Sequence, residues 1–385
     1  MSDFHVSRRA ELPDRFRIER CLRLPEFGPR ILFFSGGSAL RKTARVLKRY
    51  THNSTHVITS FDSGGSSAEL RRVFRMPSIG DLRNRLLSLA DESVQGNPEI
   101  YRLFSHRLPV DEPADRLAER FGSLLRGEDP LVAELPSSLG NIVRTHLRAF
   151  DDHSRGKGFD LRGASIGNLV LAAGYLENET HLDSVLFLFS KLVGALGQVV
   201  PVTEEYAHLA AELSDGRRVL GQHRLRKAGA CIESIELVAG LDDPRPVSVS
   251  PNRKAIDAVR DADLLCLPMG SFYSSIVANL LVPGVASAIA GCPCPRVHVP
   301  NTGVDPEQGG RSVADCLEVL RSLLGNEVPV DFVLLDRSDV PYSVPPERAR
   351  IRAMGVDVIE LDLVDGATPE VISPERLVEA LVSLT

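Results

Sequence analysis

Two short apolar runs, each ending at a pair of glycines, constrain the fold of this chain more than any other feature. Residues 31–34 (ILFF) lead into the turn SGG at 35–37 and then into a helical pattern, and residues 57–61 (VITSF) lead into DSGG at 62–65 before a second helical pattern. Repeated strand–turn–helix units build a parallel sheet that is covered by helices on both faces. The sequence therefore predicts an α/β fold with a doubly wound, Rossmann-like parallel sheet.

The two glycine pairs also favour an anion at both turns. Gly36 and Gly37, and Gly64 and Gly65 with Ser66 after them, let the backbone approach a ligand closely. The free N–H groups at the start of the following helix attract negative charge. Neither turn matches GxxxxGK[ST] or GxGxxG, so the chain has no P-loop and no full dinucleotide fingerprint. For each turn taken alone, a plain strand-to-helix connection is the alternative.

Asp62 has the clearest chemical role in this region. It lies at the carboxyl end of an expected strand, where open α/β sheets bind their ligands, and a carboxylate beside phosphates usually holds Mg²⁺ or a ligand hydroxyl. Its alternative role is to cap the next helix. On that helix, Arg71 has the guanidinium fork that clamps phosphate, although a single arginine there also fits a solvated surface position.

A third motif, GDLRNRLLSLAD at 80–91, begins a helix whose leucines repeat at helical spacing. Asp81 and Asn84 are three residues apart and share one face, whereas Arg83 points to the opposite side. We predict that Asp81 and Asn84 belong to the same phosphate-handling surface. Capping of the helix by Asp81 is the alternative.

Composition describes an ordinary α/β protein and excludes several classes. With 385 residues, 25% charged and 43% hydrophobic residues and a formal net charge of −6, the chain is neither disordered nor a basic nucleic-acid binder. No apolar stretch predicts a membrane span or a signal peptide. The six cysteines fit neither a zinc site nor a disulfide framework, so we expect reduced thiols in a cytoplasmic protein. A thiol or metal centre at Cys292 and Cys294 would match no standard spacing.

The expected organisation is an N-terminal extension, residues 1–29, followed by one α/β domain, residues 30–385. Amphipathic patterns at 98–150 predict a helical subdomain, and alternating β-branched residues at 197–240, with an Asp-Gly pair at 215–216, predict an antiparallel β-hairpin insertion. The α/β pattern then returns with a helix at 255–262, a strand at 263–267 and a third anion-loop junction at 268–271. Further strands are expected at 296–299, 331–335 and 356–361, and helices at 312–324 and 374–384.

Later segments complete a recognisable series of motifs: ASIGNL at 164–169, PMGSFYSSIVANLL at 268–281 and PNTGVDPEQGG at 300–310. In their order, together with DSGGSSAELRR and GDLRNRLLSLAD, they resemble the family that joins 2-phospho-L-lactate transferase (CofD), of deazaflavin cofactor biosynthesis, to the YvcK-type gluconeogenesis factors. The resemblance covers about residues 30–324, and the two motifs between 62 and 91 are its most specific part.

The resemblance implies a Rossmann-like core that binds a nucleotide-linked phosphorylated ligand. Gly36, Gly37 and Ser38 would lie near phosphate, and Asp62 would stand at an acidic position that lies by the metal and the reacting phosphate in the transferase branch. Asn168 matches the asparagine of the family's SFGN-like motif. The GPGSLYTSI-like loop, which suits a diphosphate, and the asparagine after it are matched by Gly270, Ser271, Tyr273, Ser274 and Asn279.

Two functional hypotheses follow from this resemblance. In the first, the chain binds a nucleoside-diphosphate-linked ligand and, with Mg²⁺ at Asp62, transfers a phosphoryl-linked group to an acceptor hydroxyl. In the second, it is a noncatalytic YvcK-like regulator of carbon metabolism or cell-wall synthesis that binds a UDP-sugar. Ser63 replaces the family's second acid, which weakens a two-carboxylate metal site, and the SPDLDT-like segment of the deazaflavin transferase is absent. By analogy with the family we expect a homodimer.

Overall fold

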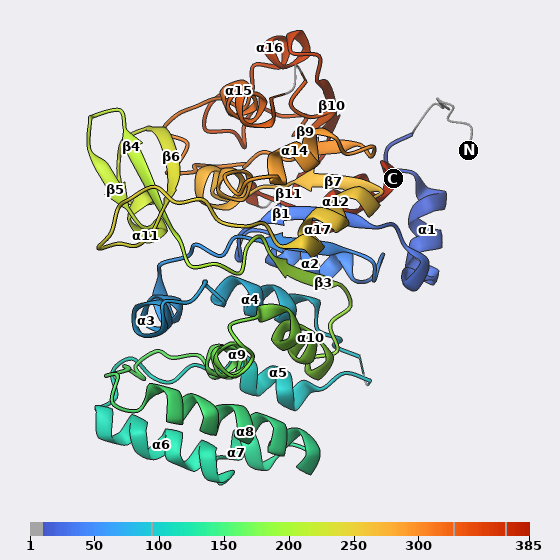
Figure 1. The fold of residues 1–385 in the computed structure, drawn as a ribbon. Helices are drawn as coiled ribbons and strands as arrows, with labels where there is room; N and C mark the ends of the chain where they lie inside the picture. Colours follow the sequence, from blue (N-terminus) through green and yellow to red (C-terminus); the bar gives the residue numbers. More distant parts are fainter. Residues whose placement is uncertain (1–10, 94, 326–327, 366–367) are drawn as a thin grey trace.

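The computed structural model describes residues 11–93, 95–325, 328–365 and 368–385, and a seven-stranded sheet forms its centre (Figure 1). Neighbouring strands pair in parallel in the order β10-β9-β8-β7-β1-β2-β3. Their bounds are β1 (Ile31–Ser35), β2 (Thr55–Ile58), β3 (Gln198–Pro201), β7 (Leu264–Leu267), β8 (Arg296–His298), β9 (Phe332–Asp336) and β10 (Asp357–Leu361). The predicted doubly wound parallel sheet is confirmed.

Burial of the sheet on both faces explains why its strands are apolar without interruption. Successive side chains of a strand point to opposite faces, and in β1 Leu32 and Phe34 pack into one core cluster while Ile31 and Phe33 pack into another. One cluster is completed by α12 (Arg253–Asp261), α14 (Val285–Ala290) and α15 (Val313–Leu324). The other is completed by α2 (Arg41–Leu47) and α17 (Pro374–Ser383).

The order of the strands creates a switch point between β1 and β7. The chain leaves β1 toward β2 and β3 on one side, and it returns with β7 on the other side of β1 before continuing to β8, β9 and β10. The loops that follow β1 and β7 therefore diverge at the carboxyl edge of the sheet. In open α/β sheets this divergence leaves the crevice in which ligands bind.

A helical layer lies beyond the β3 side of the sheet (Figure 1). The helices of this layer share a buried hydrophobic cluster of their own. They are α4 (Gly80–Leu89), α5 (Pro98–Ser105), α6 (Ala114–Arg126), α7 (Pro130–Ala133), α8 (Ser137–Ser154), α9 (Ile166–Glu177) and α10 (Leu182–Leu192). The expected helical range, 98–150, covers only the middle of this layer.

The antiparallel insertion is a three-stranded sheet of β4 (His208–Leu213), β5 (Arg218–Leu220) and β6 (Ile232–Val238), in the order β5-β4-β6. Gly216, with a φ of +81°, lies in the β4–β5 turn as the Asp-Gly pair predicted. One part of the expected range lies elsewhere: residues 198–201 form β3, the edge strand of the parallel sheet, beside β2.

The remaining elements are short or terminal. They are α1 (Arg15–Arg23), η1 (Pro25–Phe27), α3 (Gly65–Phe74), α11 (Gln222–Leu225), the π-helical η2 (Phe272–Val277), α13 (Ala278–Leu280), α16 (Arg348–Ala353), β11 (Val364–Asp365) and β12 (Thr368–Ile372). Residues 1–10 of the expected extension lie outside the described part of the chain. Within that part, no helix is both long enough and apolar enough to cross a membrane.

Candidate functional site

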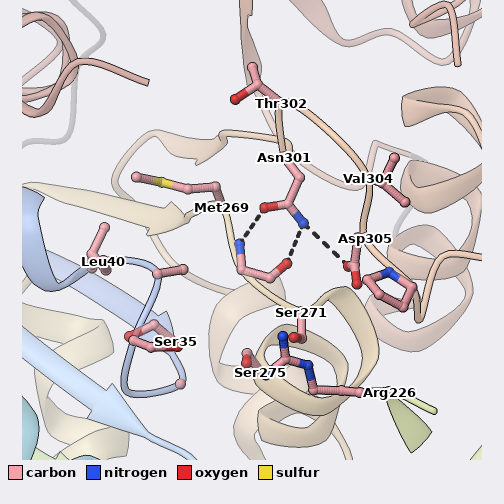
Figure 2. Close-up of a pocket in the computed structure, with 15 residues that line it drawn as sticks. Ser35, Leu40, Arg226, Met269, Ser271, Ser275, Asn301, Thr302, Val304 and Asp305 are labelled. Atoms are coloured by element: carbon pink, nitrogen blue, oxygen red, sulfur yellow. Dashed lines mark hydrogen bonds between the residues drawn. The ribbon is translucent and has the colours of Figure 1, made fainter. Parts of the chain in front are cut away.

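A polar cavity of about 200 Å³ occupies the switch point (Figure 2). The loop after β1 contributes Gly36 and Ser38, and the loop after β7 contributes Gly270 and Ser271. The loop after β8 adds Asn301 to the same cavity. The first and third anion loops that the sequence predicts therefore meet at one place, although they are more than 200 residues apart in the chain.

The β7 loop is held in shape by the side chain of Asn301 (Figure 2). The backbone N–H of Gly270 donates to Oδ1 of Asn301 at 2.8 Å, and Nδ2 of Asn301 donates back to the carbonyl oxygen of Gly270. Asp305 fixes the next turn, because its Oδ2 accepts from the backbone N–H of Phe272 at 2.8 Å. A loop fixed in this way can present backbone N–H groups to an anion without reorganising.

Two close approaches explain the glycine pair after β1. A Cβ at Gly36 would lie 2.5 Å from Oγ of Ser275, and a Cβ at Gly37 would overlap the carboxylate of Asp81. Any larger residue would have to displace one of these neighbours. The glycines thus lie between η2 of the cavity on one side and the first turn of α4 on the other.

Asp81 lies against this loop and forms an electrostatically interacting pair of carboxylates with Asp62. Burial raises the pKa of Asp62, and a hydrogen bond at 3.0 Å from the N–H of Gly64 to its Oδ1 opposes that rise. Burial and then the negative charge of Asp62 raise the pKa of Asp81 to about 6, against the opposing effects of the Gly37 N–H and of nearby arginines. Asp62 thus bonds to the N–H of Gly64, the residue that immediately precedes α3, whereas Asp81 lies within α4 and does not cap it.

The sequence predicts a weakened metal site, because Ser63 stands where the family has a second acid. Asp81 supplies a second carboxylate from another helix. In the described part of the chain, no three His, Cys, Asp or Glu side chains are grouped as a metal site. Two carboxylates suit Mg²⁺ only when substrate phosphates complete its octahedral shell. The residues present therefore fit Mg²⁺ that arrives with a phosphorylated ligand.

The second anion loop, residues 62–66, lies next to the Asp62–Asp81 pair. Gly65 has a φ of +50°, which favours glycine, and the hydroxyl of Ser66 accepts from Nδ2 of Asn168 at 2.9 Å. Asn168 is 1% exposed, and its Oδ1 has no hydrogen-bond partner among the described residues. The structure thus brings Ser66 and Asn168 together, and their side chains bond to each other.

Arg71 has a structural role in place of the predicted phosphate clamp. It is 2% exposed and donates to the carbonyl oxygens of Phe61 and Asp62, at 2.8 and 2.7 Å, and also to those of Met76 and Ala207. Burial lowers its pKa to about 10. Its guanidinium fixes the end of the strand region that carries Asp62, which leaves no free fork for phosphate.

Three predicted residues of the β7 loop also point into the core. Tyr273 donates to the carbonyl oxygen of Ile232 at 3.3 Å, Ser274 donates to Glu307 at 2.6 Å, and Asn279 donates to the carbonyl oxygen of Ser275 at 2.7 Å. All three are buried, and none lines the cavity. The wide turns of η2 direct Ser271 and Ser275 to the cavity instead.

Arg226 is a cavity residue that the sequence did not indicate, whereas Asn301 and Asp305 lie in the motif at 300–310 but were not predicted individually. Arg226 follows α11 of the antiparallel insertion, and Figure 2 shows its side chain beside Ser271 and Ser275. Its side chain is exposed and makes no hydrogen bond or ion pair within the described ranges, and its positive charge acts on the carboxylates of Asp305 and Glu307. No local pattern marks it, because only the fold brings the insertion to the cavity.

The cysteine pair lies away from this site. Sγ of Cys292 and Sγ of Cys294 are 2.9 Å apart, but they precede the first residue of β8, at the opposite edge of the sheet from the cavity. The structure thus gives these thiols no part in the site.

Comparison with known proteins finds relatives over most of the chain. A Nostoc sp. protein named "Putative gluconeogenesis factor" is 32% identical over 311 residues, which cover 80% of this chain and 55% of the relative. The "Gluconeogenesis factor" of Bacillus subtilis is 29% identical over 349 residues, which cover 87% of this chain and 91% of the relative. The chain therefore spans about half the length of the Nostoc protein but nearly all of the Bacillus protein.

Structure and family comparisons agree with this result. The crystal structure of protein BH3568 from Bacillus halodurans has the same fold, with a TM-score of 0.69, 24% identity, and coverage of 92% of this chain and 99% of that one. The family model described as 2-phospho-L-lactate transferase CofD matches residues 31–365, from β1 to β11. The chain belongs to the CofD family.

Proposed function

We propose that the chain binds a nucleoside-diphosphate-linked small molecule, with its diphosphate in the cavity between the β1 and β7 loops. The observation that carries this proposal is the cavity at the switch point, where Gly36 and Gly270 allow close approach and Arg226 adds an exposed guanidinium that makes no hydrogen bond or ion pair in the described structure. The family name, which denotes a transferase of a phosphorylated group, supports the same ligand class.

Transfer of a phosphoryl-linked group to an acceptor hydroxyl is the reaction we assign to the Asp62–Asp81 pair. The acceptor oxygen would form a bond to the phosphorus of the transferred group, the bond from that phosphorus to its bridging oxygen would break, and a nucleoside monophosphate would leave. Asp81, with a pKa of about 6, is suited to take the hydroxyl proton near neutral pH. Mg²⁺ held by Asp62 and the ligand's phosphates would neutralise developing charge and would leave Asp81 free to act as the base.

The names of the relatives favour a second function, a role in metabolism without catalysis, and for this role we propose a UDP-sugar as the bound signal. Relatives that align over 86–93% of this chain are called gluconeogenesis factors, a name that describes a role in metabolism rather than a reaction. In this version the same cavity would hold the ligand, and Asp62 would hold a Mg²⁺ that also binds the ligand's phosphates, without turnover.

Isothermal titration calorimetry with UDP-sugars, GDP and GTP, each with and without Mg²⁺, tests the binding proposal. We expect one of these ligands to bind the wild type in a Mg²⁺-dependent manner. Arg226→Ala should weaken binding about tenfold, the usual effect of losing one charge-assisted hydrogen bond. Arg224→Ala is the matched control, because it removes an exposed arginine two residues away that does not line the cavity. If none of the nucleotides binds, the proposal fails.

Phosphorus-31 NMR with a candidate acceptor separates the two functions. Release of a nucleoside monophosphate that stops in Asp81→Asn supports transfer. Tight binding with no release over hours supports the regulatory function.

A further inference from the structure

A second polar cavity, of about 290 Å³, lies between α2, α4 and α5, and none of its lining residues lines the cavity at the switch point. We name it the arginine pocket, after Arg41 and Arg45 of α2, Arg83 of α4, and Arg107, which follows α5. Ser88 and Tyr101 add hydroxyl groups to its wall. No carboxylate from the described residues lines it.

Two of the four arginines are anchored by the protein. Arg83 is only 3% exposed; it donates to the hydroxyl of Ser165 and to Oδ1 of Asn84, while its Nε has no hydrogen-bond partner within the described structure. Arg45 donates from Nη2 to the hydroxyl of Tyr101 at 2.7 Å. These contacts fix the two guanidinium groups in the wall, so that little side-chain freedom is lost when a ligand binds.

The positive charge of the pocket is incompletely neutralised. Its nearest ion-pair partner is Glu92, whose oxygens lie 3.9 Å from Nε of Arg45 and 3.3 Å from Nζ of Lys48, so that one carboxylate serves two cations. Arg107 is exposed and donates one long hydrogen bond, 3.3 Å, to the carbonyl oxygen of Gly163. Arg41 is exposed and has no ion pair with any described residue.

Repulsion between the arginines of the pocket favours an anionic ligand there. Burial and then the charge of Arg107 lower the pKa of Arg83 to about 10, while Asp81 opposes that shift. A buried guanidinium that faces another cation is costly unless an anion compensates it. Planar guanidinium forks match the oxygen geometry of phosphate, and the hydroxyls nearby add further donors.

We propose that the arginine pocket binds a small oxyanion, either inorganic phosphate or the phosphate group of a metabolite monoester. This site is separate from the nucleotide cavity. α4 connects the two cavities: Asp81 lies against the Gly36–Gly37 loop, whereas Arg83 and Asn84 line the arginine pocket together. The prediction that Asp81 and Asn84 share one surface, with Arg83 on the opposite side, is therefore wrong. The inference goes beyond the proposed function and does not depend on it.

Calorimetric titration of the full chain with inorganic phosphate and, separately, with glucose 6-phosphate tests the proposal at constant ionic strength. We expect one site, and both Arg41→Ala and Arg107→Ala should weaken it about tenfold or more, since each removes a charge-assisted contact. Both side chains are exposed, so the variants should keep the wild-type melting temperature. Arg116→Ala, an exposed arginine on α6 outside the pocket, should bind like the wild type.

A third variant separates this pocket from the nucleotide cavity. Arg226→Ala, proposed to weaken nucleotide binding, should keep the phosphate response. Equal phosphate binding by the wild type and both pocket variants, or loss of binding in Arg226→Ala alone, would overturn the proposal. Tighter binding of the sugar phosphate than of phosphate would identify a metabolite as the occupant, and the reverse order would identify free phosphate.

Discussion

At the residue scale, the transfer reaction that we propose depends on the coupling between Asp62 and Asp81. The charge of Asp62 contributes to raising the pKa of Asp81 to about 6. We predict that Asp62→Asn lowers the pKa of Asp81 toward its ordinary value near 4, because the repulsion is removed while the burial stays. Carboxyl-carbon NMR of protein labelled at aspartate Cγ measures this shift. Asp152→Asn, an exposed change on α8, should leave the titration of Asp81 as it is; an unchanged titration in Asp62→Asn would contradict the coupling.

Residue types alone could not separate binding arginines from structural ones. Arg71 and Arg226 each have a basic neighbour in the sequence, Arg72 and Lys227, but Arg71 folds back onto four carbonyl oxygens and Arg226 reaches the cavity. The partner groups of Arg71 include Ala207, which is 136 residues away in the chain. The role of such a side chain is set by tertiary neighbours that local spacing does not encode.

At the element scale, the β7 loop owes its shape to an asparagine on the neighbouring β8 loop. Asn301→Ala removes the acceptor for the Gly270 N–H and the donor to its carbonyl oxygen. We expect a loss of about 1–3 kcal/mol in the free energy of unfolding and a weaker affinity for any diphosphate ligand. Urea unfolding and calorimetry measure the two effects. Asn141→Ala, exposed on α8, should change neither; full ligand affinity in Asn301→Ala would show that the loop is ordered without this clamp.

The positions of β1, β2 and β7 could be predicted because each apolar run leads within a few residues to a turn that contains glycine. The edge strand β3 could not be separated from the insertion in this way, since residues 198–201 have the same alternating texture as residues 208–213. The orientation of Tyr273 and Ser274 was also beyond local patterns. The π-helical geometry of η2 turns them into the core and presents Ser271 and Ser275 to the cavity.

At the scale of the whole molecule, buried histidines make stability depend on pH. His298 in β8 is 2% exposed, and its Nδ1 lies 2.9 Å from the carbonyl oxygen of Leu267. Burial lowers its pKa from 6.5 to about 4, and burial also lowers the pKa of His208 to about 3 and that of His56 well below its usual value. The unfolded chain therefore binds protons at these histidines before the folded chain does, and stability falls as pH drops below about 6.5.

His298→Asn isolates one part of this dependence, because asparagine keeps a donor for the Leu267 carbonyl but does not titrate. From a folded pKa of about 4, His298 alone should lower the free energy of unfolding by about 2 kcal/mol between pH 7 and pH 5. Asp81 acts in the opposite direction, since its raised pKa favours the folded state as pH falls. This contribution of Asp81 is the same in the wild type and in His298→Asn. We expect urea unfolding at the two pH values to show a smaller loss in His298→Asn than in the wild type, even if the variant is less stable at pH 7. His181→Asn, an exposed change, should show the wild-type loss; an equal loss in His298→Asn would mean that His298 is not held neutral by the fold.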